Sequence, residues 1–529
     1  MFDDSSGLEQ SRTEAVGTVN QRTTSTQWNV AQRLPTLITE PGRTTAYTYD
    51  AAGNPLTVTV TDTATGVART TTRTYNSLEL LSSVTDPMGN VTSYGYDNFG
   101  ELTSITNPLG QITQITAYNA DGRPLSVVDA NGVETDLTYD PIGRLASKST
   151  AGATTRYTYD RMGNLTMVTL PTGVYVQYSY DQAERLVQIN DNLNDTITYQ
   201  LDSLGNRTGE TTEDPNGNIT RVTHSAYDDL NHLTQVTGGA GQMTAYAYDP
   251  LGNVTGVTDP LGNQRHQSFD SLNRLASVID TAGGTTNYTH DPLDRVTDVT
   301  DPKNLDTHYV YDGFGDVVET DSPDTGKTTF TYDLDGNRLT KADANGNTTT
   351  YTYDALNRVT STAYTDTSLD VTYTYDSGTD GVGRLTGIQD KSGSTAYVYD
   401  ARGNTIQKSV TVEANTFVIS YQYDLADELS SFTYPDGIQI KYLRDQVGRI
   451  TTVLETRKNV LSAIAGGITY EPFGPITHLG FSNGLTESRS YDQDYRLTGI
   501  SAPGIALGIS RPFSSQARSA RKARAIRKP

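Results

Sequence analysis

A short motif built around Tyr-Asp recurs along almost the whole chain, and its spacing constrains the fold more than any other feature. The acidic or amide residue after the aromatic serves as a phase mark, which gives 22 marks between Asn29 and Asp492, 18 of them Asp. Thirteen of the 21 intervals between marks are 21 residues long. The residue before the mark is Tyr in 17 copies, and Gly, Asn or Asp lies three residues after it in 17 copies. Such a period indicates a repeat architecture.

Each repeat predicts two antiparallel strands and two turns. In the pattern TxYxYD, the two Tyr at i and i+2 lie on one face of a strand. The Asp opens a turn that closes at a residue tolerant of positive φ. In "NFGELTSITNPLGQ" the run Leu102–Thr106 is the second strand, and the Asn-Pro-Leu-Gly that follows is the second turn.

The residues that define the repeat are the Tyr, the Asp mark and, where present, the Gly three residues later. We assign this role to Tyr49, Asp50, Gly53, Tyr96, Asp97, Gly100, Tyr139, Asp140, Gly143, Tyr248, Asp249, Gly252, Tyr332, Asp333, Gly336, Tyr353, Asp354, Tyr399, Asp400 and Gly403.

The number of repeats restricts how the hairpins are arranged. Two strands per repeat give roughly forty strands, whereas open sheets seldom exceed about ten before they curl or split. A propeller would need about ten blades, above the usual four to eight. We therefore expect an all-β fold, in which tandem hairpins wind into a spiralling antiparallel sheet that forms a shell or part of one. The expected divisions are a polar lead-in at 1–21, the repeat region at 22–500 and a basic tail at 501–529.

Composition excludes several classes of function. The net charge of -22 argues against nucleic acid as a partner, because phosphate backbones are bound by clustered Lys and Arg. There is no Cys, so neither disulfides nor thiolate metal sites are available. The start, MFDDSSGLEQ, lacks the pattern of a signal peptide, and no stretch has the length of a membrane span. We expect a protein that is secreted or at the cell surface by a route without a cleavable leader, or cytoplasmic if the chain is a non-functional fragment.

The segments "YTYDAAGNPLTVT", "YGYDNFGELTSITNPLGQ" and "YTYDALNRVTSTAY" resemble the YD, or Rhs, repeats of bacterial Rhs polymorphic toxins, insecticidal toxin complexes and teneurins. The resemblance covers roughly residues 22 to 500. It implies a hollow β-shell that encloses a C-terminal toxin until delivery to a neighbouring cell, in a secreted or surface-exposed protein. The implied partners are the remainder of the shell and that toxin.

Two departures from the family pattern lie near the end of the sequence. In bacterial members a plug with an autoproteolytic motif similar to DPxGL precedes the toxin, and no such segment follows "SYDQDYRLTGI". The final nineteen residues carry seven basic residues and no acid. This tail is interpreted either as a functional basic arm or as the product of a shifted or truncated reading frame. The expected chain is a partial or truncated shell without plug or cargo.

Several candidate sites have simpler structural explanations. Asp249-Pro250 and Asp259-Pro260 could be cleavage bonds, but Asp-Pro before Gly is ordinary turn chemistry and recurs in phase. The turns "DLDGN" and "DANGN" have neither the Gly at position six nor the Glu at position twelve of an EF-hand calcium loop. Solvated turns are therefore the default interpretation.

No residue pattern indicates an enzyme, a metal or a cofactor. The six histidines form no spaced ligand set, and there is no GxSxG elbow or phosphate loop. His290 takes the place of the Tyr in its own repeat. Tyr pairs such as Tyr351 and Tyr353 either stack on sugars, as in a cell-surface adhesion or carbohydrate-binding protein, or pack against neighbouring strands. We expect a structural, non-enzymatic protein, with glycan binding as the alternative.

Overall fold

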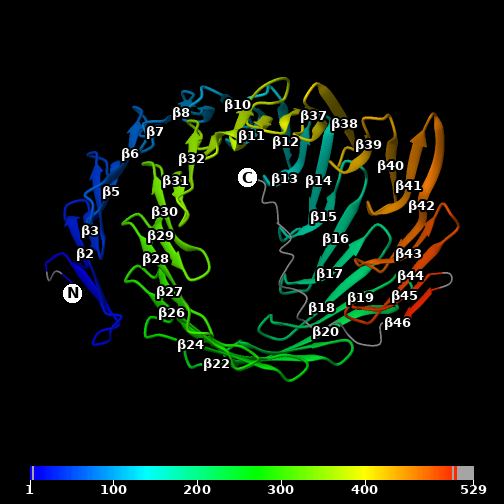
Figure 1. The fold of residues 1–529 in the computed structure, drawn as a ribbon, viewed down its shortest axis with the longest axis horizontal. Coiled ribbons are helices and arrows are strands. Elements are labelled where there is room, and N and C mark those ends of the chain that lie inside the picture. The colour runs from blue at the N-terminus through cyan, green and yellow to red at the C-terminus, as the bar shows by residue number, and fades with distance from the viewer. Residues whose placement is uncertain (3–4, 503–504, 509–529) are drawn as a thin grey trace. The chain divides into compact units, whose positions relative to one another are not determined.

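A computed structural model describes residues 1–2, 5–502 and 505–508, so most of the basic tail predicted at 501–529 lies outside the described residues. Within them the chain forms 46 β-strands and a single 3-10 turn, η1 (Thr367–Leu369). The predicted all-β fold of tandem antiparallel hairpins is confirmed (Figure 1).

The strands divide between two compact units. Unit 1 comprises Met1–Gly152, Ala247–Thr258 and Gly262–Ile419, and unit 2 comprises Ala153–Tyr246, Asp259–Leu261 and the described residues from Ser420 onward. Two strands, β22 (Met243–Tyr248) and β38 (Asn415–Tyr423), cross the boundaries.

Unit 1 contains two runs of hairpins, which we call the early run (β1–β13) and the late run (β23–β37). The strands of the early run are β1 (Ser11–Glu14), β2 (Arg22–Asn29), β3 (Leu34–Glu40), β4 (Arg43–Tyr49), β5 (Pro55–Asp62), β6 (Ala68–Tyr75), β7 (Leu81–Thr85), β8 (Val91–Tyr96), β9 (Leu102–Thr106), β10 (Ile112–Tyr118), β11 (Pro124–Val128), β12 (Glu134–Tyr139) and β13 (Leu145–Thr150). Those of the late run are β23 (Val254–Thr258), β24 (Gln264–Phe269), β25 (Leu275–Ile279), β26 (Thr285–His290), β27 (Val296–Thr300), β28 (Asp306–Tyr311), β29 (Val317–Ser322), β30 (Gly326–Tyr332), β31 (Arg338–Ala342), β32 (Thr348–Tyr353), β33 (Val359–Tyr364), β34 (Val371–Tyr375), β35 (Leu385–Asp390), β36 (Gly393–Tyr399) and β37 (Thr405–Val412).

Unit 2 also contains an early run, up to β22, and a late run that begins with β38. Its other strands are β14 (Ala153–Tyr159), β15 (Leu165–Thr169), β16 (Tyr175–Tyr180), β17 (Leu186–Asp191), β18 (Thr196–Leu201), β19 (Arg207–Glu213), β20 (Ile219–Tyr227), β21 (Leu233–Gly238), β39 (Leu429–Thr433), β40 (Gln439–Arg444), β41 (Ile450–Arg457), β42 (Val460–Tyr470), β43 (Ile476–Phe481), β44 (Thr486–Tyr491), β45 (Leu497–Ala502) and β46 (Ile505–Gly508). Within every run each strand pairs antiparallel with the next, as β8 does with β9.

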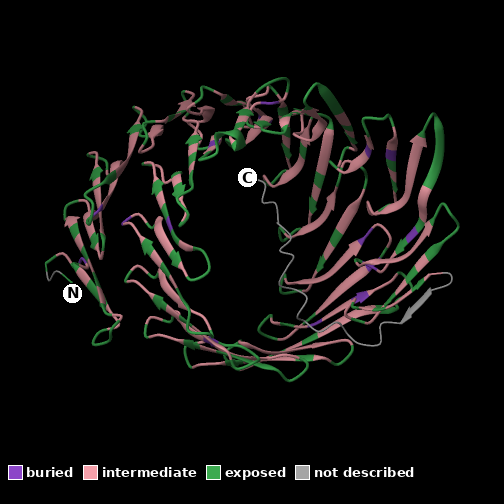
Figure 2. Ribbon diagram, in the orientation of Figure 1, coloured by how far each residue is buried: buried purple, intermediate pink, exposed green. Residues whose placement is uncertain are grey.

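The sheet is a single layer, and its residues are mostly half-buried (Figure 2). Among the described residues, only four apolar side chains fall to about a tenth exposed or less: Leu8, Val278, Ile440 and Ile468. The strands before each turn alternate between exposed and half-buried residues, as in β32. On the exposed face, hydroxyls pair across strands, for example Thr352 with Ser361 at 2.7 Å. Cross-strand pairs of this kind stabilise a sheet where no second layer covers it.

Most of the turns at both ends of the hairpins share one geometry. We call the turn after the Tyr-Asp mark the YD turn and the turn to the next hairpin the linking turn. In the YD turn at 50–54, Gly53 N donates to Asp50 O at 3.2 Å and Asp50 N to Asn54 O at 3.0 Å. Gly53 has φ 95°, and the register shifts by one residue between Thr48 and Tyr49. These are features of a three-residue hairpin loop with a left-handed residue and a bulge. The linking turn at 86–90 repeats the bonds.

The left-handed conformation persists where the sequence offers no Gly, Asn or Asp. Glu79, Glu184 and Tyr495 lie three residues after their marks and have φ of 60°, 62° and 59°. The mark's own side chain enforces the turn, because Asp181 Oδ1 accepts from Ala183 N at 2.9 Å and from Arg185 N at 3.0 Å.

Replacing Glu184 with Gly should stabilise its turn by about 1 kcal/mol, since a non-Gly residue is strained in the left-handed region. Ala183 is not among the residues with positive φ, so Ala183→Gly should destabilise the same turn by about 0.5 kcal/mol or more. Hydrogen exchange of the Arg185 amide would measure both. Equal effects of the two substitutions would contradict this account.

Candidate functional site

The repeat-defining residues make the same hydrogen bonds in repeat after repeat, and these bonds are the most regular polar feature of the molecule. We call a bond that joins one hairpin to the next a tie. The Asp mark closes its own turn, as Asp97 does by accepting from Phe99 N and Glu101 N at 2.8 and 2.9 Å. The Tyr before the mark reaches back to the preceding hairpin. Tyr96 donates its hydroxyl to Leu81 O at 2.9 Å. Asp and Tyr therefore have different functions: the first shapes a turn and the second joins two repeats.

The Tyr tie recurs in at least 14 repeats of the described chain. In each, the phenol donates to a carbonyl at the start of the second strand of the previous hairpin, which belongs to the first residue of that strand except for Tyr49, whose acceptor is the second residue, Pro35. The donors are Tyr49, Tyr75, Tyr96, Tyr118, Tyr139, Tyr180, Tyr227, Tyr311, Tyr332, Tyr353, Tyr375, Tyr399, Tyr470 and Tyr491. Phe cannot make this bond, which explains why Tyr precedes the mark in 17 of 22 copies.

Two repeats without the Tyr keep the tie by other means. In the repeat of Phe269, Gln267 Nε2 donates to Val254 O at 2.9 Å. In the repeat of Arg444, its own guanidinium donates to Leu429 O at 3.0 Å. In these two repeats the carbonyl of the second strand therefore receives a donor although the sequence departs from the motif.

The residue four positions after the mark makes a second tie. The sequence motif did not include this residue. It is often Arg or Asn. Arg295 Nε donates to Asp291 Oδ2 at 2.6 Å, and its NH1 donates forward to Asp312 O at 2.6 Å. The same guanidinium lies over the Tyr311 ring, 4.7 Å from its centroid. Arg358 and Arg449 lie over Tyr375 and Tyr470 in the same way. Arg384, which closes the longer turn after Asp376, lies over Tyr399. The frequent occurrence of Arg or Asn at this position could have indicated its contact with the Asp mark.

Replacing Tyr311 with Phe should remove one tie and leave Val296 O without its donor, at a cost of about 1 kcal/mol. The ring and its contact with Arg295 remain. Tyr309 on the same strand is the matched control, because its hydroxyl has no hydrogen bond to any described residue. Amides of β27 should exchange about fivefold faster in Tyr311→Phe and at an unchanged rate in Tyr309→Phe; equal rates in the two variants would contradict the role of the tie.

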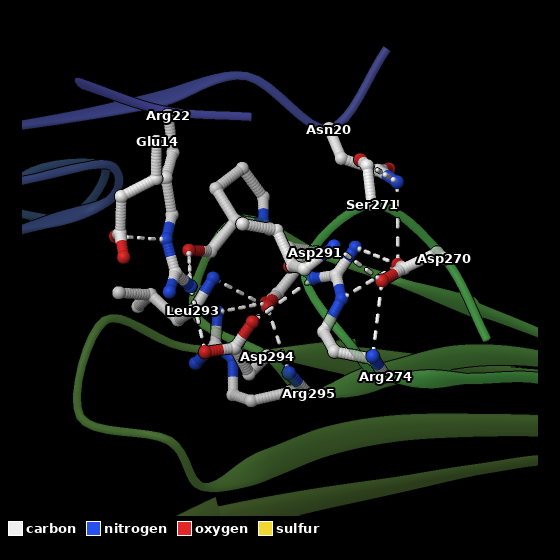
Figure 3. A network of polar contacts seen from close by, with 12 residues as sticks. Glu14, Asn20, Arg22, Asp270, Ser271, Arg274, Asp291, Leu293, Asp294 and Arg295 are labelled. Carbon is white, nitrogen blue, oxygen red and sulfur yellow. Dashed lines mark hydrogen bonds and ion pairs between the residues drawn. The ribbon is translucent and has the colours of Figure 1, made fainter. Parts of the chain in front are cut away.

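Within each unit, YD turns of the late run dock on linking turns of the early run. In unit 1, Arg22 at the start of β2 donates to Asp294 Oδ2 at 2.6 Å and to Pro292 O at 3.1 Å (Figure 3). Asn20 donates to Asp270 Oδ2 at 3.2 Å. The paired residues are about 250 positions apart in sequence.

Further along unit 1 the docking continues. Arg69 forms an ion pair with Asp316 at 2.6 Å and lies 3.9 Å from the centroid of the Phe314 ring. Asn131 and Val382 exchange two hydrogen bonds, at 3.1 and 2.8 Å. A Cβ on Gly313 would lie 2.7 Å from the Asp62 backbone, so only Gly allows the approach there.

Unit 2 has the same arrangement between its own runs. Val222 N donates to Gln493 O at 3.1 Å, and Thr220 Oγ1 lies 2.7 Å from Tyr495 OH. A cavity of about 490 Å³ lies beside this contact, lined by Asp195, Asp214, Arg449 and Glu471 among others. Burial, and then the nearby Asp191 carboxylate, raise the pKa of Asp195 to about 6. Arg449 lies 3.7 Å from that carboxylate.

The predicted repeat-defining residues lie on strand ends and turns of separate hairpins. Asp333, Tyr353 and Asp354 line one cavity, but the set as a whole is not gathered into a single pocket. In the described part of the chain, no group of three or more His, Asp or Glu residues is placed to hold a metal ion. No helix in the same residues has the length and apolar character needed to cross a membrane.

Comparison with known proteins accords with this geometry. A family model described as RHS Repeat matches residues 75–112, 118–153, 139–175 and 227–264, and one described as Teneurin YD-shell matches 284–467. Together they match more than half of the chain. The chain belongs to the Rhs/YD-repeat family. No curated protein matches this YD-repeat chain significantly.

Solved structures share the fold of this family member. The crystal structure of TcdB2-TccC3 superposes with a TM-score of 0.63 at 14% identity, over 91% of this chain and 32% of that one. TcdB2-TccC3 without its hypervariable C-terminal region gives 0.64 at 13% identity, over 92% and 34%. TcdB2-TccC3-Cdc42 gives 0.63 at 12%, over 91% and 34%. This YD-repeat chain therefore spans about a third of the length of each.

Proposed function

We propose that the chain forms part of the wall of a YD-repeat shell that encloses a toxin and serves in contact-dependent competition between bacteria. One observation carries the proposal. In each unit the late run docks on the early run edge to edge, through turns, so a one-layer sheet is extended sideways without a second layer. Edge-to-edge extension of one layer produces a wall, whereas an enzyme fold packs two or more layers into a core around its active site.

The polar chemistry of the repeats supports a structural role. The Tyr hydroxyls that form the ties, the Asp marks and the Arg side chains four residues after them bond to backbone groups or to one another. The solved structure of TcdB2-TccC3 without its hypervariable C-terminal region has the same fold, so that protein is one in which such a region accompanies the fold. We expect such a region to be the partner, the chain to have no catalytic role, and the protein to act at the cell surface or in the medium.

Protection from protease tests the enclosure. The chain would be produced with the toxin region encoded beside it, and digested with proteinase K under native conditions. The toxin region should resist digestion in the presence of the chain and be degraded without it. A catalytically inactivated toxin region is the appropriate cargo, since it keeps the host alive. Equal degradation in both samples would contradict encapsulation, and mixed-culture killing would then test the competition role separately.

Carbohydrate binding is the second candidate, favoured by a cavity of about 360 Å³ in unit 1. Its lining includes Tyr351, Tyr353, Asp333, Asn90 and Asn357. Aromatic faces beside carboxylate and amide groups suit sugar recognition. A glycan array would test it with Tyr351→Ala, because the Tyr353 hydroxyl already donates to Arg338 O at 2.8 Å. Selective binding that Tyr351→Ala abolishes would support this function over a wall alone.

A further inference from the structure

The two runs of unit 1 each leave one edge uncovered, and the two uncovered edges are of opposite kinds. The contact inside the unit uses late-run YD turns and early-run linking turns. The early-run YD turns at 76–80, 97–101 and 140–144, which we call the rim, are not used for it within the described residues. Nor are the late-run linking turns at 280–284, 301–305 and 343–347, which we call the free linking edge.

The same turn position is covered in one run and exposed in the other. Two residues after the mark, Leu293 and Phe314 of the late run are half-buried against the early run. At that position in the rim, Leu78, Phe99 and Ile142 are 53%, 90% and 67% exposed. Asp121 occupies this position in the turn between those of Phe99 and Ile142. Three apolar side chains at this level of exposure on one edge indicate an interaction surface.

The linking turns show the reverse contrast. Pro87 and Pro108, in early-run linking turns, are half-buried, whereas Pro302 and Pro323, in late-run linking turns, are exposed. The rim therefore lacks a set of linking turns, and the free linking edge lacks a set of YD turns. Each edge therefore carries the kind of turn that the other edge is missing.

We propose that the rim of one copy of this chain docks on the free linking edge of a second copy, by the contact that already joins the two runs inside the unit. The turns have the same hydrogen-bonding pattern on both edges, as at 97–101 and 343–347. The contact is heterologous, because two different surfaces meet, so copies add head to tail.

Paired variants test the proposal. The rim variant carries Phe99→Asp and Ile142→Asp, and the edge variant carries Ala282→Asp and Asn345→Asp. Asp is compatible with this turn position, since Asp121 and Asp335 occupy it naturally. The control is Val398→Asp, an exposed apolar residue within a strand. Hydrogen exchange of the Val382 amide checks that the contact inside the unit is intact in every variant.

Sedimentation velocity over a hundredfold range of concentration gives the readout. The unmodified chain and Val398→Asp should associate with increasing concentration. The rim variant alone and the edge variant alone should each associate at least tenfold more weakly. An equimolar mixture of the rim and edge variants should form a dimer and nothing larger, because each retains one intact surface. An edge variant that self-associates normally would indicate rim-to-rim pairing and overturn the proposal. A chain that stays monomeric at every concentration would overturn it as well.

Discussion

Replacing Arg358 with alanine should destabilise the late run of unit 1 by about 3 kcal/mol, the largest effect that we expect from a single side chain. Its guanidinium, 18% exposed, bonds Asp354 Oδ2 at 2.7 Å and both carboxylate oxygens of Asp376, at 3.0 and 2.6 Å. Hydrogen bonding to Asp376, opposed by burial, keeps the pKa of Arg358 above its ordinary value. The variant leaves two carboxylates close together without a cation and exposes the Tyr375 ring.

The measurement is hydrogen exchange of the amides in β32 to β34, where 3 kcal/mol corresponds to roughly 150-fold faster exchange. Arg265→Ala is the matched control, because that residue is exposed and lies in the same run. Asp354→Asn with Asp376→Asn in the Arg358→Ala background should recover part of the loss, since the unpaired charges are removed. Similar exchange rates in Arg358→Ala and Arg265→Ala would show that the ion pairs of Arg358 with Asp354 and Asp376 do not stabilise the late run.

Replacing Asp195 with asparagine should stabilise unit 2 at pH 7.5 by about 2 kcal/mol and have little effect at pH 4.5. Burial raises the pKa of this carboxyl to about 6 in the folded protein, whereas an unfolded chain titrates near 4. The folded protein therefore binds the extra proton between these pH values. Stability from this group rises as pH falls from about 6 to 4 and is lost above about 6.

The comparison of two proteins isolates this effect from other titrating groups. Asp229→Asn is the control, because Asp229 is exposed in the same unit and the substitution removes the same charge. Urea unfolding followed at both pH values gives the free energies. If the free energies of unfolding of Asp195→Asn and the parent differed by the same amount at pH 7.5 and 4.5, the raised pKa would be contradicted. If the variant were less stable than the parent at pH 7.5, the ion pair with Arg449 would outweigh the cost of burial.

The local structure follows from the sequence because its determinants lie within one repeat. The Asp mark and the left-handed residue three positions later predict the turn, and the spacing of the strands predicts tandem hairpins. The exceptions show where prediction from residue type ends. Glu184 adopts φ 62° because the Asp181 carboxylate holds the surrounding amides, which residue preference alone does not reveal.

The contacts between runs could not be predicted, because the partners lie about 250 residues apart and share no motif. Arg22 meets Asp294 and Asn131 meets Val382 through turns of different composition. Asp335 lies beside Asp86 in the same interface, where burial and then that carboxylate raise its pKa. A sequence with one period throughout gives no signal for which repeat meets which. The Tyr tie was likewise missed, since its acceptor is a backbone carbonyl.

The docking of late YD turns on early linking turns has a consequence for biosynthesis. The partners of an early linking turn are separated from it by 247 to 275 residues. At roughly 5–20 residues per second, a ribosome needs on the order of 12–55 s to supply them. During that interval the nascent early hairpins have only neighbouring hairpins for support, and their turns and strand edges are open to other chains. Slow translation or premature release at this stage would therefore favour aggregation, and chaperone demand should be highest before residue 270 emerges.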